Sequence, residues 1–309
     1  MQQVYPSYYP HFRCIAGDCR HSCCVGWEID VDAAALEKYR SVGGELGEKL
    51  KRSITRGKTP HFKLADGERC PFLNGKNLCD LIDLGSEDLL CQICADHPRF
   101  RNFFSSRTEV GLGLCCEEAA RLILSQHEKI TFISEGEAEL PDRQEAELLA
   151  LRDELFALAQ DRSIPITARE DAVLRRVGAA LPERSASEWA AFYLSLERMD
   201  EAWTALLQDL DDADDAAFTA YMRPRETEYE QLLCYFLYRH LPTALDDGDV
   251  SGKAAFAVFS TRFLRRLGAW QYQKTGCFTR CDQIELARLY SAEIEYSQEN
   301  LDALFDELG

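Results

Sequence analysis

The chain has 309 residues, 46% of them hydrophobic, which is enough for one large domain or two ordinary domains with a sizeable core. Its 53 acidic residues outnumber the 35 basic ones and give a formal net charge of −18. This balance argues against a nucleic-acid-binding protein, because phosphates require a basic surface. An acidic surface favours solubility and is compatible with a cationic substrate such as a lysine side chain.

The first residues carry neither the basic nor the apolar segment of a secretory signal, and no apolar run is long enough to span a bilayer. The most apolar run, residues 232–241, contains Arg239 and His240. We therefore expect a cytoplasmic protein with no membrane partner and with reduced thiols. Reduced thiols favour metal ligation, and a disulfide framework is the alternative.

Short elements are expected in residues 1–133, which mix apolar pieces with glycine, proline and cysteine. Asp32 precedes the run 33–39 and predicts the N-cap of a short helix there. The charged, glycine-punctuated residues 41–67 predict a turn-rich segment with one weak helix.

A small antiparallel β pair is expected between residues 62–64 and 70–73, because Asn74-Gly75 follows as a turn signal. Further along, residues 117–130 predict a helix whose acidic first turn complements the helix dipole. The glycine spacing of residues 111–115 resembles a nucleotide-binding loop but lacks the strand–loop–helix context. This favours a structural role for these glycines.

Residues 134–142 are polar and acidic and contain both glycine and proline, which predicts a linker. Beyond it, residues 143–309 show helical periodicity almost throughout, without the fixed repeat of a solenoid. The expected fold is mainly α: a cysteine-rich, metal-organised N-terminal module with short strands, followed by an irregular helical bundle. The candidate helices of the bundle are residues 143–160, 166–181, 186–210, 226–241, 252–275 and 282–308.

Ten of the 13 cysteines lie between Cys14 and Cys116, in clusters spaced by a few residues. Clustered thiolates can converge on one centre and are soft ligands for zinc, copper(I) or iron–sulfur units. Cys91 and Cys94 form a Cys-x-x-Cys knuckle, a common way for one turn to offer two thiolates to a metal. Since one centre uses about four ligands, several of the ten are expected to be buried small hydrophobic residues instead.

The ligands expected first are six cysteines from three clusters, namely Cys23, Cys24, Cys70, Cys79, Cys91 and Cys94. A second group of candidate ligands contains Cys14, Cys19, Cys115 and Cys116. His97 is a weaker candidate ligand, and His21 is weaker still. The surplus of thiols leaves open whether the metal is zinc or an iron–sulfur cluster, and whether there are one or two centres.

The residues around these cysteines resemble the flagellin lysine-N-methylase family. The resembling segments are residues 8–30, 70–73, 78–82, 91–99 and, near the end of the chain, 289–301. The resemblance therefore covers essentially the full length. The cysteine half is also similar to a broader set of cysteine-cluster domains described as zinc- or iron-binding, a similarity that speaks only to metal binding.

The resemblance implies the transfer of methyl groups to lysine ε-amines of flagellin, which would be the protein partner. It further implies S-adenosylmethionine as methyl donor and a [4Fe-4S] cluster as inorganic centre, with zinc as the alternative metal. Radical enzymes use the spacing Cys-x-x-x-Cys-x-x-Cys, whereas here Cys24 follows Cys23 directly. This departure puts a radical mechanism in doubt.

Methylation of a lysine needs a neutral amine, in-line placement and surroundings that tolerate a cationic donor. Aromatic faces and carboxylates suit such cations. The candidate catalytic residues are Tyr8, Trp27, Asp30 and Glu293, with Tyr5, Tyr9 and Glu295 as further aromatic and acidic groups. Core packing or a solvated helix face is the alternative role of each residue.

A non-enzymatic metal-binding module is the main alternative to an enzyme. It would be an iron–sulfur carrier, or a zinc-stabilised adaptor whose helical half binds a partner protein. A redox sensor that uses the paired cysteines is disfavoured, because so many clustered thiols suit permanent ligation better.

Overall fold

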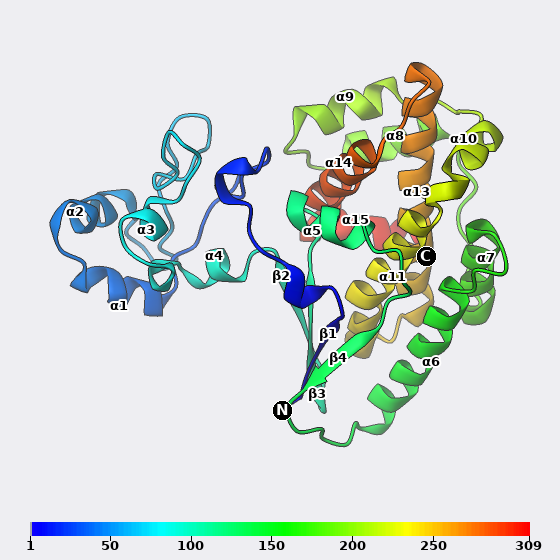
Figure 1. Ribbon diagram of the computed structural model, residues 1–309, viewed down its shortest axis with the longest axis horizontal. Helices are drawn as coiled ribbons and strands as arrows, with labels where there is room; N and C mark the ends of the chain where they lie inside the picture. The colour runs from blue at the N-terminus through cyan, green and yellow to red at the C-terminus, as the bar shows by residue number, and fades with distance from the viewer. Residues whose placement is uncertain (1) are drawn as a thin grey trace. The chain divides into compact units, whose positions relative to one another are not determined.

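The computed structural model describes residues 2–309, apart from the side chain of Asp215, and consists mainly of helices with one small sheet (Figure 1). This confirms the expected mainly α class. The chain forms two compact units: unit 1 combines Met1–Phe12 with Phe100–Gly309, and unit 2 is Arg13–Arg99. The division therefore falls at positions other than the expected linker 134–142, and both ends of the chain belong to unit 1.

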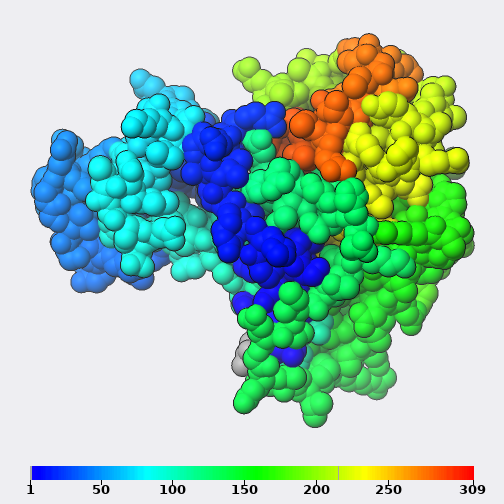
Figure 2. Space-filling model, viewed as in Figure 1, coloured from blue at the N-terminus to red at the C-terminus, as the bar shows by residue number. Residues whose placement is uncertain are grey.

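Unit 2 is built from short helices and loops, whose light-blue and cyan residues pack together in Figure 2. Its elements are η2 (Ala16–Asp18), α1 (Ala33–Ser41), α2 (Gly44–Ser53), α3 (Asp80–Asp83), η3 (Glu87–Leu89) and α4 (Gln92–Asp96). Asp32 caps α1 as expected, since its Oδ1 accepts a hydrogen bond of 2.9 Å from the Ala35 amide. Helix α2 is the one helix expected within residues 41–67.

Isolated β-bridges connect the loops of unit 2 instead of the predicted β pair between residues 62–64 and 70–73. That prediction is wrong, because Phe62 pairs with Ile54, and Asp30 pairs with His61. The turn at Asn74 serves a different bridge, from Leu73 to Cys79. The Asn74 side chain stabilises this turn by accepting hydrogen bonds from two amides within it.

The small core of unit 2 is aromatic and contains two of the cysteines. Phe62 packs edge-on against Phe72 with ring centroids 5.0 Å apart, and Tyr39 lies 6.3 Å from Phe62. Cys70 and Cys91 are buried in the same cluster. The residues that form the core of unit 2 are therefore also candidate metal ligands.

Unit 1 contains a four-stranded mixed sheet in the order β2-β3-β1-β4, which the sequence did not predict. Its strands are β1 (Gln2–Pro6), β2 (Arg99–Phe103), β3 (Arg107–Leu112) and β4 (Phe132–Glu135). Strand β1 runs parallel to β3, with Val4 opposite Glu109, and antiparallel to β4, with Val4 opposite Ser134. The expected linker thus begins inside a strand, because residues 134 and 135 belong to β4.

The remaining elements of unit 1 are helical (Figure 1). They are η1 (Tyr9–His11), α5 (Glu117–Leu124), α6 (Arg143–Ala159), α7 (Ile166–Val177), α8 (Ala186–Ser195), α9 (Glu201–Asp209), α10 (Asp215–Met222), η4 (Arg223–Arg225), α11 (Thr227–His240), η5 (Leu241–Thr243), α12 (Ala244–Asp247), α13 (Val250–Thr275), α14 (Arg280–Tyr290), the π-helical turn η6 (Ser291–Glu295) and α15 (Gln298–Leu308).

Helices α6, α11 and α13 lie where periodicity predicted them, within two residues at each end. Two long predicted helices are each interrupted. Residues 186–210 form α8 and α9, and residues 282–308 form α14, the π-turn and α15. Helix α7 ends early because Gly178 adopts a left-handed conformation (φ 70°) that favours glycine. Helix α10 was not predicted, and α5 stops at Leu124 rather than at residue 130.

Gly111 lies within strand β3, and Gly113 follows the strand ahead of helix α5. The strand–loop–helix context that the sequence had not indicated is therefore present. The structure nevertheless gives both glycines a packing role. A Cβ atom on Gly111 would collide with the ring of Phe100, and one on Gly113 would collide with the hydroxyl of Tyr296. The two positions require glycine because side chains pack directly on the backbone.

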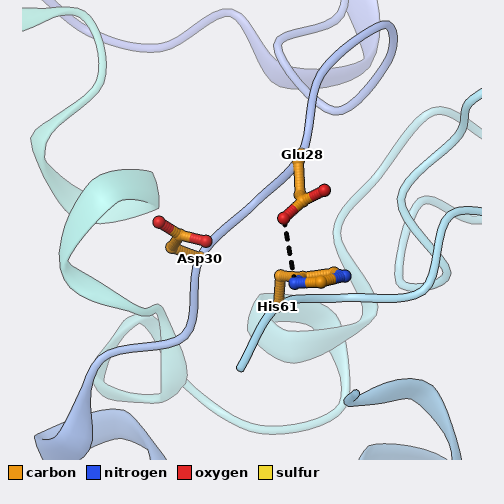
Figure 3. Close-up of side chains that lie close together, drawn as sticks. All are labelled: Glu28, Asp30 and His61. Atoms are coloured by element: carbon orange, nitrogen blue, oxygen red, sulfur yellow. Dashed lines mark ion pairs between the residues drawn. The ribbon is translucent and has the colours of Figure 1, made fainter. Parts of the chain in front are cut away.

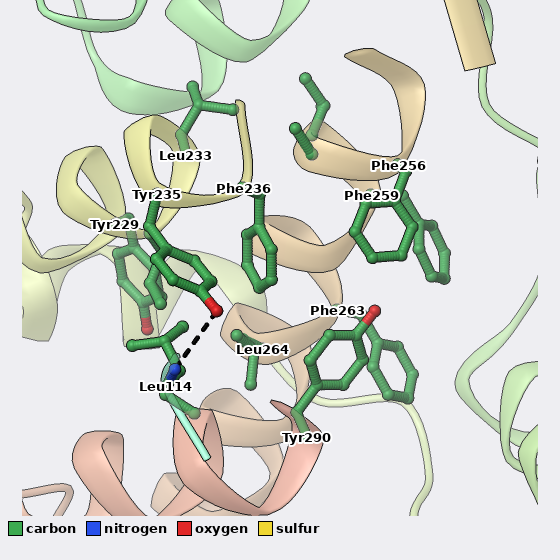
Figure 4. Packing of buried hydrophobic residues seen from close by; sticks show 14 of the residues in the cluster. Leu114, Tyr229, Leu233, Tyr235, Phe236, Phe256, Phe259, Phe263, Leu264 and Tyr290 are labelled. Carbon is green, nitrogen blue, oxygen red and sulfur yellow. Dashed lines mark hydrogen bonds between the residues drawn. The ribbon is translucent and has the colours of Figure 1, made fainter. Parts of the chain in front are cut away.

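The core of unit 1 centres on α11 and α13, whose buried aromatic side chains face each other (Figure 4). Phe236 of α11 packs edge-on against Phe256 of α13, with centroids 5.8 Å apart. It packs in the same way against Tyr290 at the end of α14, at 6.0 Å. Because α11 is buried on nearly all sides, its sequence reads as a continuous apolar run rather than as an amphipathic helix.

A buried ion pair connects the sheet to the helices. Glu109 of β3 is fully buried and receives two hydrogen bonds, of 2.6 and 2.7 Å, from the guanidinium of Arg152 on α6. The same guanidinium lies over the ring of Tyr238 on α11, 5.5 Å from its centroid. This one arginine therefore joins β3, α6 and α11.

Replacing Arg152 by Met should destabilise the protein by up to about 3–5 kcal/mol, because the buried Glu109 carboxylate would lose its bidentate partner and keep only the Arg107 guanidinium at 2.5 Å. Chemical denaturation monitored by circular dichroism measures the loss. The matched control is Arg143→Met on the same helix, which breaks the exposed pair Arg143–Glu147 (2.8 Å) and should change stability little. Equal effects of the two variants would contradict the assigned role of Arg152.

Candidate functional site

Backbone pairing in unit 2 brings together two cysteine clusters that are 46 residues apart in the sequence. The Cys70 amide donates a hydrogen bond of 2.7 Å to the carbonyl of Cys24, and a bridge joins Val25 to Arg69. As a result the Cys24 thiol is hydrogen-bonded to the thiols of Cys70 and of its neighbour Cys23. Three of the six cysteines expected first thus meet at one place.

The Cys-x-x-Cys knuckle lies on the first turn of α4. Cys91 is the N-cap of this helix, and its Sγ lies 3.3 Å from the Sγ of Cys94. This separation is far longer than a disulfide bond of about 2.05 Å. It is close to the roughly 3.8 Å expected between two sulfurs on a tetrahedral zinc with Zn–S bonds of about 2.3 Å. The knuckle already has the arrangement of a pair of metal ligands.

The two thiol groups and Cys79 share one electrostatic environment. Hydrogen bonds from Cys23 and Cys70 hold the pKa of the Cys24 thiol well below its ordinary value. The pKa of the Cys94 thiol is raised, first by its hydrogen bond to the Cys91 thiolate and then by burial. The charges of Cys24 and Cys70 raise it further. Such mutual influence places these thiols in one neighbourhood, in which the first thiolate forms readily and further ones need a cation.

His97 belongs to the same neighbourhood. Burial lowers the pKa of its imidazole to about 4, although the nearby charge of Cys24 opposes the shift. Near neutral pH the ring is therefore uncharged, which is the form that ligates metals. Ligation of a metal by His97 stays a prediction.

The donor set of unit 2 consists of soft ligands. Five thiols (Cys24, Cys70, Cys79, Cys91 and Cys94) and the neutral imidazole of His97 influence one another electrostatically. Among the described residues, however, no three of these groups place their ligand atoms within 4.8 Å of one another. None of the cysteines in the described residues forms a disulfide. Zinc or an iron–sulfur cluster needs about four such ligands, and a metal at this place stays a prediction.

The second group of candidate ligands is divided between the two units. Cys14 is exposed, and the Cys19 thiol donates to the backbone carbonyl of His21 at 3.2 Å in the first loop of unit 2. Cys115 and Cys116 belong to unit 1. There Cys115 is hydrogen-bonded to the hydroxyl of Tyr296, and burial raises the pKa of its thiol to about 12.

Arg239 and Glu295 form a buried polar network close to Cys115. The Glu295 carboxylate accepts hydrogen bonds from His240 Nε2 at 2.6 Å and from the Tyr235 hydroxyl at 3.0 Å, and Arg239 lies 3.3 Å away. Burial opposes the charge on Glu295, but Arg239 and His240 outweigh it and lower its pKa. Burial also lowers the pKa of His240, so this ring is neutral and donates to a carboxylate.

The four candidate catalytic residues lie in different units. Tyr8 is buried in the core of unit 1. The Glu293 carboxylate accepts hydrogen bonds from the backbone amides of Met199 and Asp200 ahead of α9. In unit 2, Trp27 donates its indole N–H to the Cys23 carbonyl at 2.7 Å, whereas Asp30 is exposed. Glu293 and Tyr8 thus have structural partners, and Trp27 contacts the backbone of Cys23. The catalytic roles of all four residues stay predictions.

Asp30 is part of an acidic group that the sequence did not reveal. Glu28, Asp30 and His61 offer ligand atoms within 4.8 Å of one another, and Glu28 pairs with His61 Nδ1 at 2.9 Å (Figure 3). Within residues 2–309 no other three His, Cys, Asp or Glu side chains meet this criterion. Glu28 and Asp30 are exposed, and His61 is half-buried. The β-bridge between Asp30 and His61 brings the three residues together. Because that bridge forms only on folding, the sequence alone did not reveal the group.

The fold and the site define a mainly helical protein with a second, thiol-rich unit. Residues 111–309 match the family model described as FliB lysine N-methylase C-terminal domain. The chain belongs to this lysine-N-methylase family, as its cysteine segments and its C-terminal segment indicated.

Similar curated proteins carry related names. The chain is 27% identical over 128 residues to the lysine-N-methylase of Salmonella choleraesuis (strain SC-B67), a match that covers 39% of this chain and 32% of that protein. It is 26% identical over 128 residues to the flagellar biosynthetic protein FliU of Salmonella muenchen, covering 39% of this chain and 75% of that protein. The match thus spans about a third of the first relative's length.

No solved structure matches the chain significantly. Among the described residues, no helix is both long enough and apolar enough to cross a membrane.

Replacing Cys91 by Ala should remove most of the bound metal and destabilise unit 2, because metal-binding free energy is folding free energy in such small units. Elemental analysis of anaerobically purified protein measures zinc and iron per chain. Cys277→Ala is the matched control, since Cys277 is an exposed thiol of unit 1. Unchanged metal content in Cys24, Cys70, Cys79, Cys91 and Cys94 variants alike would exclude the centre.

Replacing Glu295 by Gln should destabilise the protein near neutral pH by about 3–5 kcal/mol, because Arg239 would stay buried without a counter-charge. Since folding lowers the pKa of Glu295, its stabilisation is present above the pKa of an unfolded glutamate, about 4.3, and is lost as the pH falls further. The difference between wild type and variant should therefore shrink below about pH 4.

Urea denaturation at several pH values tests this expectation. The exposed Glu299, replaced by Gln in the same C-terminal region, is the control and should leave the stability unchanged. A difference between wild type and Glu295→Gln that stays constant into acid would mean that the carboxylate charge contributes nothing.

Proposed function

We propose that the protein is an S-adenosylmethionine-dependent protein lysine N-methyltransferase that acts on flagellin in the cytoplasm and carries a cysteine-ligated iron–sulfur cluster. Membership of the FliB family over residues 111–309 is the observation that carries the proposed activity. The flagellar name of one relative supports flagellin as the substrate. The converging thiols of unit 2 support the cluster.

The ligands of the proposed cluster are drawn from the five converging thiols, with His97 as a further donor. Cys91 and Cys94 would bind together from one turn, and Cys24 and Cys70 together from two paired segments. Tyr39 packs beside these thiols, and its hydroxyl is held by the carbonyl of Leu89 at 2.8 Å.

The reaction proposed is a displacement at the methyl carbon of the donor. The neutral lysine nitrogen forms a bond to that carbon, the carbon–sulfur bond breaks, and its electron pair stays on the sulfur. S-adenosylmethionine supplies the electrophilic methyl group. The proton that the lysine ammonium must first lose is taken up by solvent or by a base, and the acidic chain (net charge −18) favours approach of a basic substrate segment.

A zinc-stabilised adaptor without enzymatic activity is the second candidate function. The observation that favours it is the placement of Cys70 and Cys91 inside the hydrophobic core of unit 2. Ligands in such a position suit a closed structural site, which has no open coordination position for chemistry.

Incubation of anaerobically purified protein with S-adenosylmethionine and flagellin should produce mass increments of one methyl group on flagellin lysines, measured by peptide mass spectrometry. Brown protein that contains iron and sulfide is expected at the same time. Replacing Cys91 by Ala should abolish cluster and methylation together, whereas Cys277→Ala should retain both. Colourless protein with stoichiometric zinc and no methylation would favour the adaptor.

A further inference from the structure

A cavity of about 630 Å³ lies within unit 1, in the region matched by the family model. Its size is typical of pockets for small ligands. The loop ahead of α8, helix α8 and helix α13 supply its lining, which consists of Leu181, Pro182, Glu183, Arg184, Ser185, Trp189, Phe259, Arg262, Phe263, Arg265 and Arg266. Four arginines in one cavity are unexpected in a chain of such strong negative charge.

Two of these guanidinium groups are fixed by a fully buried carboxylate. Glu170 of α7 receives hydrogen bonds from Arg262 at 2.9 Å and from Arg265 at 2.6 and 2.9 Å. Arg262 also pairs with Asp171 at 2.6 Å. These contacts hold both side chains in place before any ligand arrives, which lowers the entropic cost of binding.

Arg184 provides a flat surface at the cavity. Its guanidinium lies over the indole ring of Trp189, 4.9 Å from the ring centroid, and pairs with Glu307. Trp189 itself is fixed by Phe259, whose ring centroid is 4.4 Å away. A planar guanidinium that lies over an aromatic ring is a surface on which another planar group can stack.

Arg266 is the arginine of the cavity whose charge is available to a ligand. It donates to the backbone carbonyl of Arg184 at 3.1 Å, and no carboxylate within the described residues forms an ion pair with it. Glu183, which is exposed, also lines the cavity and likewise has no ion-pair partner in the described part of the chain. The cavity thus offers one positive and one negative group to a ligand.

We propose that this cavity binds a small ligand that carries an anionic group, held by Arg266, and a flat ring system, stacked near Arg184. The presence of Arg266 and Glu183 in one lining favours an α-amino acid as the anionic end of the ligand, because an α-amino acid presents a carboxylate beside an ammonium. The inference rests on the proposed function in so far as the methyl donor and its demethylated product have this chemistry. A nucleotide shares the ring and offers phosphate instead.

Isothermal titration calorimetry of the intact, metal-replete protein tests the site with four probes: S-adenosylhomocysteine, AMP, adenosine and methionine. We expect S-adenosylhomocysteine to bind more tightly than adenosine or methionine alone. Replacing Arg266 by Ala should weaken its binding about tenfold to a hundredfold and leave adenosine unaffected, because a charge-assisted hydrogen bond is lost. Tighter binding of AMP, equally dependent on Arg266, would support the anion site and identify a nucleotide as its ligand.

Arg175→Ala is the matched control, since Arg175 is an exposed helical arginine of α7 outside the cavity lining. Arg266→Lys keeps the charge and should retain most of the affinity, so the site stays testable even if Arg266→Ala fails to fold. No binding of S-adenosylhomocysteine or AMP to wild type, or equal affinity in wild type and Arg266 variants, would overturn the proposal. If the protein methylates flagellin but substitution of Arg266 leaves its affinity for the methyl donor unchanged, only the proposed site is overturned. If ligand binding depends on Arg266 but flagellin is not methylated, only the proposed activity is overturned.

Discussion

Unit 1 depends on buried carboxylates that are each matched by arginine. Four glutamates of this unit are buried, and each forms an ion pair with at least one arginine. The pairs are Glu109 with Arg152, Glu170 with Arg262 and Arg265, Glu230 with Arg162 and Arg169, and Glu295 with Arg239. Removing such charges from water is costly, and removing one partner alone costs more still. The helices of this unit can therefore assemble only in the arrangement that completes every pair.

Unit 2 has a smaller core than unit 1, built mainly around the side chains of Tyr39, Phe62 and Phe72. Cys70 and Cys91 are buried among these side chains. A buried cysteine packs as a small apolar residue, so these two thiols contribute to the core of unit 2 in addition to being candidate ligands.

Periodicity and capping were sufficient to predict much of the fold. Asp32 marked a helix start, and α6, α11 and α13 followed their apolar patterns. The sheet was missed because β1 pairs with β3, more than 100 residues away, and strands of four to six residues carry little signal of their own. The breaks at residues 196–200 and 291–295 were missed because the apolar pattern continues across them.

The candidate site was predictable where it depends on residue chemistry and unpredictable where it depends on folding. The spacing of cysteines identified the thiols that converge, including the knuckle at Cys91 and Cys94. It could not separate Cys115 from them, because membership of unit 1 follows from the path of the chain rather than from local sequence. The arginine-lined cavity could not be predicted from the sequence either. Arg184 and Arg266 lie about 80 residues apart and meet only through tertiary packing.

The π-helical turn at Ser291–Glu295 has a consequence for how this segment tolerates insertions and deletions. Within it, Glu293 turns to the amides ahead of α9, while Glu295 turns to Arg239 and His240 on α11. Each residue of an ordinary helix adds a rotation of about 100°. Loss of one residue here would rotate α15 relative to α14. One of the two carboxylates would then point away from its polar partners and toward apolar side chains. The length of this turn is therefore fixed, even at positions where the identity of the side chain is not.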